Sequence, residues 1–129
     1  MRTIKFRGKD ILSGDLVYGD LIHGVGSKNS RMYILPTVVN LAGIKNCHPL
    51  DGVEVDPETV GQFTGLFDKN GKEIFEFDII EEGNVYFDDL YLGFFVKGDF
   101  VEGEHKPLYD IHLPEIIGNI FDNPELLKN

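Results

Sequence analysis

The chain has 129 residues, of which 42% are hydrophobic, so it is long and apolar enough to bury a core and is not expected to be disordered. A net charge of −10 disfavours non-specific binding to nucleic acid or to an anionic membrane. A single cysteine excludes an intramolecular disulfide framework, and no apolar run is long enough to predict a transmembrane helix.

The N-terminal half alternates short extended segments with turns. Ile4, Phe6 and Gly8 alternate with charged residues, which is the two-residue period of a half-buried strand. The same alternation interrupts any apolar stretch that a signal peptide would need, so we expect a cytoplasmic protein. Asp56 is the predicted N-cap of one helical turn that starts at Pro57. Further extended segments are predicted over residues 16–22, 32–41 and 53–55.

The clearest landmark is a hairpin turn at Asp68-Lys69-Asn70-Gly71. Asp68 can accept hydrogen bonds from the turn backbone, and Asn70 or Gly71 can adopt positive φ. A calcium loop at this place is excluded, because Leu66 and Phe77 would occupy positions that need oxygen ligands.

Beyond the hairpin the sequence predicts mostly strands. Phe75, Phe77 and Ile79 are expected on one face of a single strand. About ten short strands in total, and no long helical period, predict an all-β fold, as a small barrel or a sandwich. We expect a single domain over residues 1–129, with candidate β subdomains at 1–55 and 56–129. The later predicted strands are 85–87, 91–96, 100–101, 109–113 and 116–121.

The sequence offers no group of residues typical of catalysis, a cofactor or a metal site. The histidines and the cysteine lack the spacing of metal ligands. Dispersed carboxylates are a weaker basis for an enzyme, since acid–base chemistry needs two of them held together in a desolvated cleft. The residues considered are His23, His48, His105, His112 and Cys47 as ligands, and Glu54, Glu58, Glu76 and Asp78 as acids or bases.

Basic residues are concentrated at the N-terminus, where Arg2, Lys5, Arg7 and Lys9 lie within the first nine positions. The last three would form a basic stripe on one face of a strand, a candidate contact for nucleic acid. The alternative is the solvated face of an edge strand, where lysine also prevents aggregation.

Aromatic and apolar residues in the C-terminal half are candidates for an interface, because interfaces between subunits are rich in such side chains. They predict a homo-oligomer. The candidates are Phe94, Phe95, Phe100, Ile120 and Phe121.

Three stretches together resemble the YopX-like family of phage and prophage proteins: residues 55–66, 68–76 and 117–127. The segments 4–9 and 18–22 are similar to the N-terminal pattern of the same family. One departure is Phe77, which replaces a glycine usual in the family's Glu-Gly-Asp sequence. The resemblance implies an SH3-like barrel in the C-terminal half, packed with an N-terminal β subdomain, and self-association. It implies no activity and no catalytic residues.

These observations predict a phage or prophage accessory protein that acts by binding rather than by catalysis. Its expected partners are further copies of itself and a host or phage protein. Two alternatives stay open: nucleic-acid binding through the N-terminal basic strand, and an acidic surface that mimics DNA and engages a host DNA-binding protein.

Overall fold

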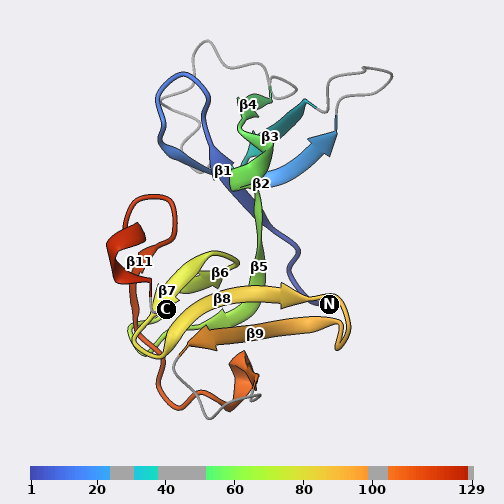
Figure 1. Cartoon of the computed structure of the whole chain (residues 1–129). Coiled ribbons are helices and arrows are strands. Elements are labelled where there is room, and N and C mark those ends of the chain that lie inside the picture. The colour runs from blue at the N-terminus through green and yellow to red at the C-terminus, as the bar shows by residue number, and fades with distance from the viewer. Residues whose placement is uncertain (24–30, 38–51, 99–104, 128–129) are drawn as a thin grey trace. The chain divides into compact units, whose positions relative to one another are not determined.

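The computed structural model describes residues 1–23, 31–37, 52–98 and 105–127 (Figure 1). These residues form β-strands and short 3-10 helices and contain no α-helix, which confirms the predicted all-β class. None of them lies in a helix that is long and apolar enough to cross a membrane. The chain divides into two compact units, Met1–Gln62 and Phe63–Asn129.

Unit 1 is an antiparallel sheet in the strand order β4-β3-β2-β1-β5. Its first strand, β1, is therefore central and pairs with both β2 and β5. The expectation of an edge strand at the N-terminus is wrong, because the start of β5 covers the second side of β1. The elements are β1 (Phe6–Lys9), β2 (Leu16–His23), β3 (Met32–Pro36), β4 (Val53–Val55), the 3-10 helix η2 (Pro57–Thr59) and the start of β5 (Gly61–Phe67).

Local sequence explains the turns of unit 1. Asp10 Oδ1 accepts a hydrogen bond from Leu12 N at 2.8 Å in the connection between β1 and β2. Asp56 accepts one from Glu58 N at 3.1 Å, so the predicted cap of η2 is confirmed. Ile34 and Val55 are fully buried and form the centre of this unit.

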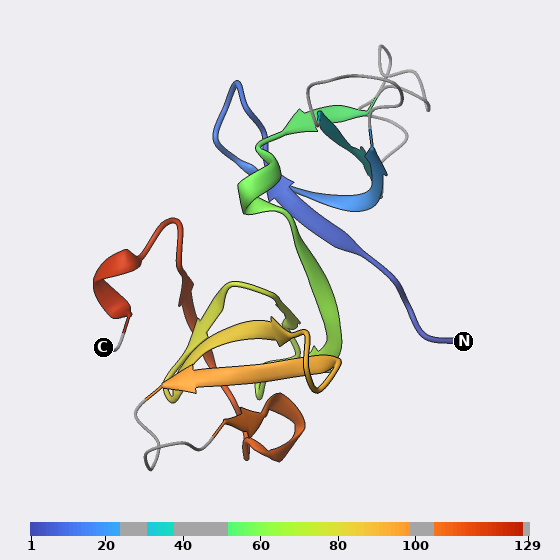
Figure 2. The ribbon, with the colours of Figure 1, turned by 45° about the vertical axis from the view of Figure 1, so that its right-hand side comes forward.

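Unit 2 holds the remainder of β5, paired with β6, and a five-stranded antiparallel sheet in the order β10-β9-β8-β7-β11. β8 and β9 form its longest hairpin, drawn in yellow and orange in Figures 1 and 2. The elements are β6 (Glu73–Phe75), β7 (Asp78–Ile80), β8 (Gly83–Asp88), β9 (Gly93–Gly98), β10 (Lys106–Pro107), η3 (Leu108–Asp110), β11 (Ile116–Asn119) and η4 (Pro124–Leu126).

The core of unit 2 takes one buried residue from each of β6, β7, β8, β9 and η3. Its five residues are each at most 1% exposed. At the start of β8 the backbones approach so closely that a Cβ on Gly83 would collide with the carbonyl group of Lys97. The core residues are Ile74, Ile80, Val85, Val96 and Leu108, with Phe94, Ile111 and Ile116 packed against them.

Three predicted strands of unit 2 differ from the structure. The strand expected through Phe77 is broken there into β6 and β7. Residues 109–113 form η3 and a bend instead of a strand, since Pro107 and Pro114 bracket the segment and Ile111 N bonds to Leu108 O at 3.0 Å. Residues 91–92 belong to the turn before β9. The expected strand at 100–101 lies outside the described residues, and the SH3-like form of the barrel stays a prediction.

Candidate binding surface

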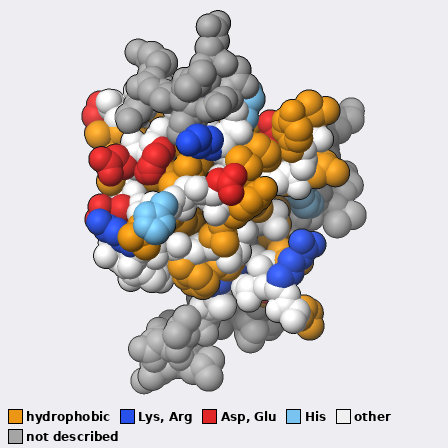
Figure 3. Space-filling view, turned by 90° about the horizontal axis from the view of Figure 1, so that it is seen from below, with side chains coloured by type: hydrophobic (Ala, Val, Ile, Leu, Met, Phe, Trp, Pro, Cys, Tyr) orange, Lys and Arg blue, Asp and Glu red, His pale blue; other side chains and the backbone are white. Residues whose placement is uncertain are grey.

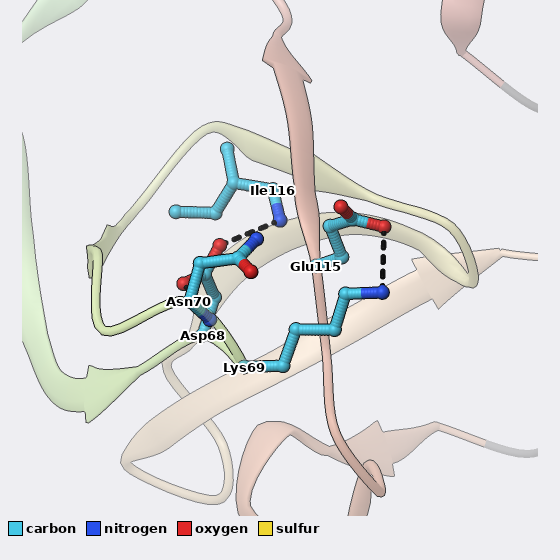
Figure 4. Close-up of polar contacts among 5 residues, drawn as sticks. All are labelled: Asp68, Lys69, Asn70, Glu115 and Ile116. Carbon is cyan, nitrogen blue, oxygen red and sulfur yellow. Dashed lines mark hydrogen bonds and ion pairs between the residues drawn. The ribbon is translucent and has the colours of Figure 1, made fainter.

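The hairpin turn at residues 68–71 is organised by the carboxylate of Asp68. Its Oδ1 accepts hydrogen bonds from Asn70 N and Lys72 N, each at 2.9 Å. Its Oδ2 accepts one from Ile116 N at 3.2 Å, which is drawn in Figure 4. Gly71 adopts a φ of 82°, which glycine tolerates without a Cβ penalty. Both predicted features of this turn are confirmed.

The environment of Asp68 favours its charged form. Burial of this residue, which is 6% exposed, raises the pKa of the carboxyl, but the hydrogen bonds from the amides of Lys72, Ile116 and Asn70 outweigh this effect and leave the pKa below its usual value. Both carboxylate oxygens accept hydrogen bonds from backbone amides, and these bonds connect the hairpin turn to β11. An ion pair of 3.1 Å between Lys69 and Glu115, visible in Figure 4, supports the same connection.

The residue that replaces the family's glycine is held in a left-handed conformation, with a φ of 75° at Phe77. Phe77 N donates to Val85 O and Phe77 O accepts from Ile120 N, each at 2.9 Å, so the backbone is fixed on both sides. Asp78 Oδ2 accepts from Phe75 N at 2.8 Å across the same turn. The Phe77 ring meets that of Phe121 edge-on, with centroids 5.3 Å apart. This turn breaks the strand that the sequence predicted.

The expected basic stripe on β1 does not form on an open face. Arg7 is 5% exposed, whereas Lys5 and Lys9 are partly buried, and Arg2 is exposed ahead of the strand. A continuous basic stripe needs Arg7 in solvent, and its burial interrupts the stripe. The alternative of an edge strand is wrong, because β1 lies between β2 and β5 in the sheet.

Five aspartates in the described residues hold turns together. Aspartate is well suited to this role, because its short side chain reaches amides two to four residues away. No three His, Cys, Asp or Glu side chains within the described ranges lie together as a metal site would require. His48 and Cys47 lie outside those ranges. The aspartates that accept from backbone amides are Asp10, Asp56, Asp68, Asp78 and Asp88.

Four of the five candidate interface residues are described, and all four are partly buried. Phe94 packs against the core of unit 2 and lies edge-on to Phe87, at 5.4 Å between ring centroids. Phe121 contacts Phe77, and Ile120 precedes it. Phe100 lies outside the described residues. Phe95 is on the opposite face of β9 from Phe94, where it contributes to the surface described next.

Among the described residues of unit 2, the most exposed apolar segment is the tip of the β8–β9 hairpin. Leu90, Tyr91 and Leu92 are 81%, 64% and 76% exposed. The backbone of the tip is ordered by Asp88, whose Oδ1 accepts from Leu90 N and Tyr91 N at 2.9 Å each. Figure 3 shows hydrophobic side chains at the surface on the face that it views, with charged ones scattered between them. Contiguous exposed apolar side chains are candidates for an interaction site.

A row of rings continues from this tip along one face of β8 and β9. Tyr91 lies beside Phe95, with centroids 5.4 Å apart; Phe95 lies 6.3 Å from Tyr86, and Tyr86 lies 6.5 Å from His105. We call Tyr91, Phe95, Tyr86 and His105 the aromatic row. Tyr86 and Phe95 are opposite each other in the strand register, so they occupy the same face.

The hydroxyl group of Tyr86 lies 3.0 Å from His105 Nδ1 and 3.4 Å from Asp88 Oδ2. Burial raises the pKa of this phenol, and the neighbouring Asp88 carboxylate raises it further. Tyr86 is therefore a neutral hydrogen-bonding group at physiological pH. The arrangement fits recognition and offers no activated nucleophile.

Sequence reasoning missed most of this surface. The sequence predicted one strand over residues 91–96, so it did not indicate that residues 91–92 lie in an exposed turn. A usable indication was Asp88-Asp89 followed by Gly93, which brackets a turn just as Asp68 and Gly71 do. The approach of His105 to Tyr86 had no local indication, because the two residues are 19 positions apart.

Comparison with known proteins identifies one family. The family model described as YopX protein matches residues 5–128, nearly the whole chain. The resemblance indicated by the three sequence stretches is thereby confirmed. A search of curated proteins finds no match for this chain.

Proposed function

This chain belongs to the YopX family, and we propose that it is a non-enzymatic binding module of a phage or prophage that self-associates in the cytoplasm of the bacterial host. The observation that carries the proposal is the exposed apolar tip of the β8–β9 hairpin, residues 90–92. Apolar surface of this kind is most stable when it is covered by a partner.

A second copy of the chain is the simplest partner for the tip. A two-fold interface places the same patch of each copy against the other, so leucine side chains can cover one another without any further component. The side chain of Leu90 and that of Leu92 would lose most of their contact with water, and each fully buried leucine stabilises by about 1.5–3 kcal/mol before the costs of association.

The net charge of the chain determines how self-association should depend on salt. Each copy carries a net charge of −10, and Asp89 lies exposed beside the tip. Two such surfaces repel each other at low ionic strength, and salt screens that repulsion. We therefore expect self-association to strengthen with added salt, opposite to the behaviour of a complex held by ion pairs.

Use of the described aspartates supports a binding role over catalysis. Each of the five named above accepts a hydrogen bond from backbone amides of its own turn. Groups committed in this way are poorly placed to transfer protons to a substrate. Of the four carboxylates considered for acid–base chemistry, Glu54 and Glu58 belong to unit 1, and Glu76 and Asp78 to unit 2.

Sedimentation equilibrium tests self-association, with the full chain at micromolar to tens of micromolar concentration in low and high salt. The variant Leu90→Ser/Leu92→Asn removes the apolar tip, and asparagine tolerates the φ of 54° at position 92. We expect the dissociation constant to rise by at least about tenfold, as for loss of an interface anchor. A strictly monomeric wild-type chain in both salts would refute the proposal.

A matched control is available in unit 1. Leu12 is 92% exposed in a turn that is also ordered by an aspartate, so Leu12→Ser removes a comparable leucine at a different place. It should leave the association constant unchanged. Equal weakening by the control and the tip variant would mean that general surface hydrophobicity, rather than the β8–β9 tip, drives association.

A further inference from the structure

The aromatic row begins at Tyr91 in the tip and continues along β8 and β9 through side chains other than the two leucines. Tyr86 and Phe95 are partly buried, while Tyr91 and His105 are exposed, so the row combines firmly packed rings with accessible ones. Successive ring centroids lie 5.4, 6.3 and 6.5 Å apart. A strip of rings on a rigid antiparallel pair is suited to an extended ligand with flat apolar groups.

Polar groups of the row can serve a ligand backbone. When the Tyr86 hydroxyl donates to His105 Nδ1, across their 3.0 Å separation, the neutral imidazole carries its proton on Nε2. Because His105 is exposed, that Nε2–H is available to a carbonyl group of a bound segment. A polyproline II segment presents such carbonyl groups freely, since it has no internal hydrogen bonds.

The charged residues beside the aromatic row favour a basic ligand over nucleic acid. The Tyr91 end of the row lies beside Asp88 and Asp89, whereas exposed Lys97 lies farther along β9, toward the other end. Carboxylates beside the rings repel a phosphate backbone, which argues against single-stranded nucleic acid. They attract lysine or arginine, and guanidinium groups also stack on aromatic faces.

We propose that the aromatic row binds a proline-rich segment of a partner protein in the polyproline II conformation, with a lysine or arginine of that segment beside Asp88 and Asp89. Aromatic-lined surfaces recognise such segments because the ligand is already extended and loses little conformational entropy on binding. This inference concerns a partner other than a second copy and does not depend on self-association.

Fluorescence anisotropy with the full chain tests the inference, using labelled peptides of ten prolines that end in arginine or in glutamate. We expect saturable binding of the arginine peptide and at least tenfold weaker binding of the glutamate peptide. Phe95→Ala should weaken the arginine peptide about tenfold, and Tyr91→Ala, at a more exposed position, should weaken it severalfold. Asp88→Asn/Asp89→Asn should abolish the preference between the two peptides.

Phe67→Ala is the matched control, because Phe67 is 56% exposed elsewhere in unit 2 and should not affect peptide binding. Circular dichroism checks that each variant is folded, and Tyr91→Ala keeps the test informative if Phe95→Ala is not. No binding of the arginine peptide at millimolar concentration, or binding unaffected by both ring variants, would overturn the inference. Tighter binding of a twelve-nucleotide oligothymidylate that depends on the same rings would also overturn it, in favour of nucleic acid.

The same titration distinguishes the two proposals. The monomeric Leu90→Ser/Leu92→Asn variant should still bind the arginine peptide, because it keeps Phe95, Tyr86 and His105. Self-association without peptide binding would remove only the peptide inference. Peptide binding by a chain that never associates would remove only the self-association.

Discussion

Replacing Phe77 by glycine and by alanine measures how much strain this chain stores at one residue. Phe77 has a φ of 75°, a conformation that costs an L-residue with a Cβ about 1–2 kcal/mol. Alanine keeps the Cβ and hence the strain, whereas glycine removes it. Both lose the edge-on contact with Phe121, worth about 0.5–1.5 kcal/mol, so that loss cancels in a comparison of the two variants.

At an ordinary position glycine is less stable than alanine by about 0.5–1 kcal/mol, because it has more freedom to lose on folding. Ile117 is 46% exposed on β11, where the register with β7 shifts, and it is not among the residues with positive φ, so glycine relieves no left-handed strain there. We therefore expect alanine to be the more stable variant at Ile117, and glycine to equal or exceed alanine at Phe77. The free energy of unfolding of the glycine variant minus that of the alanine variant should be about 1–2 kcal/mol higher at Phe77 than at Ile117.

Urea unfolding followed by circular dichroism, with tyrosine fluorescence as a second probe, measures the four free energies; the two probes must coincide for a two-state treatment. A difference between the positions below about 0.5 kcal/mol would refute the stored strain, since that is the scatter expected for independent sites. Relative to wild type, Phe77→Gly should be destabilised, because the lost ring contact, the lost burial of the partly buried side chain and the entropy cost of glycine together outweigh the relief of strain.

Further predictions concern three polar or tightly packed residues of unit 2. Asp68 has a lowered pKa in the folded chain, so its contribution to stability is complete above the unfolded pKa of about 3.9 and is lost as pH falls through the folded pKa. Asp68→Asn should lower the free energy of unfolding by about 2–3 kcal/mol at pH 7, measured by urea unfolding. It should also make the free energy of unfolding fall less steeply as the solution is acidified. An Asp68→Asn chain with the wild-type acid profile would contradict this. Gly83→Ala should reduce the free energy of unfolding by more than about 3 kcal/mol, since the added Cβ collides with the Lys97 carbonyl group, and a wild-type urea midpoint would refute the close approach. Asp88→Asn should lower the pKa of Tyr86 in an ultraviolet titration of the phenol, and an unchanged midpoint would mean that burial alone raises it.

Residues whose partners are close in sequence were predictable from the sequence alone. The turn at Asp68 and Gly71 and the cap at Asp56 depend on hydrogen bonds spanning two to four positions, and residue type decides such bonds. The turn at Phe77 was not predicted: the sequence indicated one strand through this residue, and the structure divides it into β6 and β7. Membership of the YopX family followed from the same local strings.

Only the tertiary structure decided which side chains meet over long separations. β1 is a central strand because β5 returns to pair with its second edge, and Arg7 on this strand is buried. Neither feature can be predicted from residues 2–9 alone. The aromatic row joins His105 to Tyr86 across 19 positions, and the exposed tip depends on where β8 ends and β9 begins. Alternation along a strand determines which residues share a face, whereas strand order and register determine whether that face meets a core, a neighbouring strand or solvent.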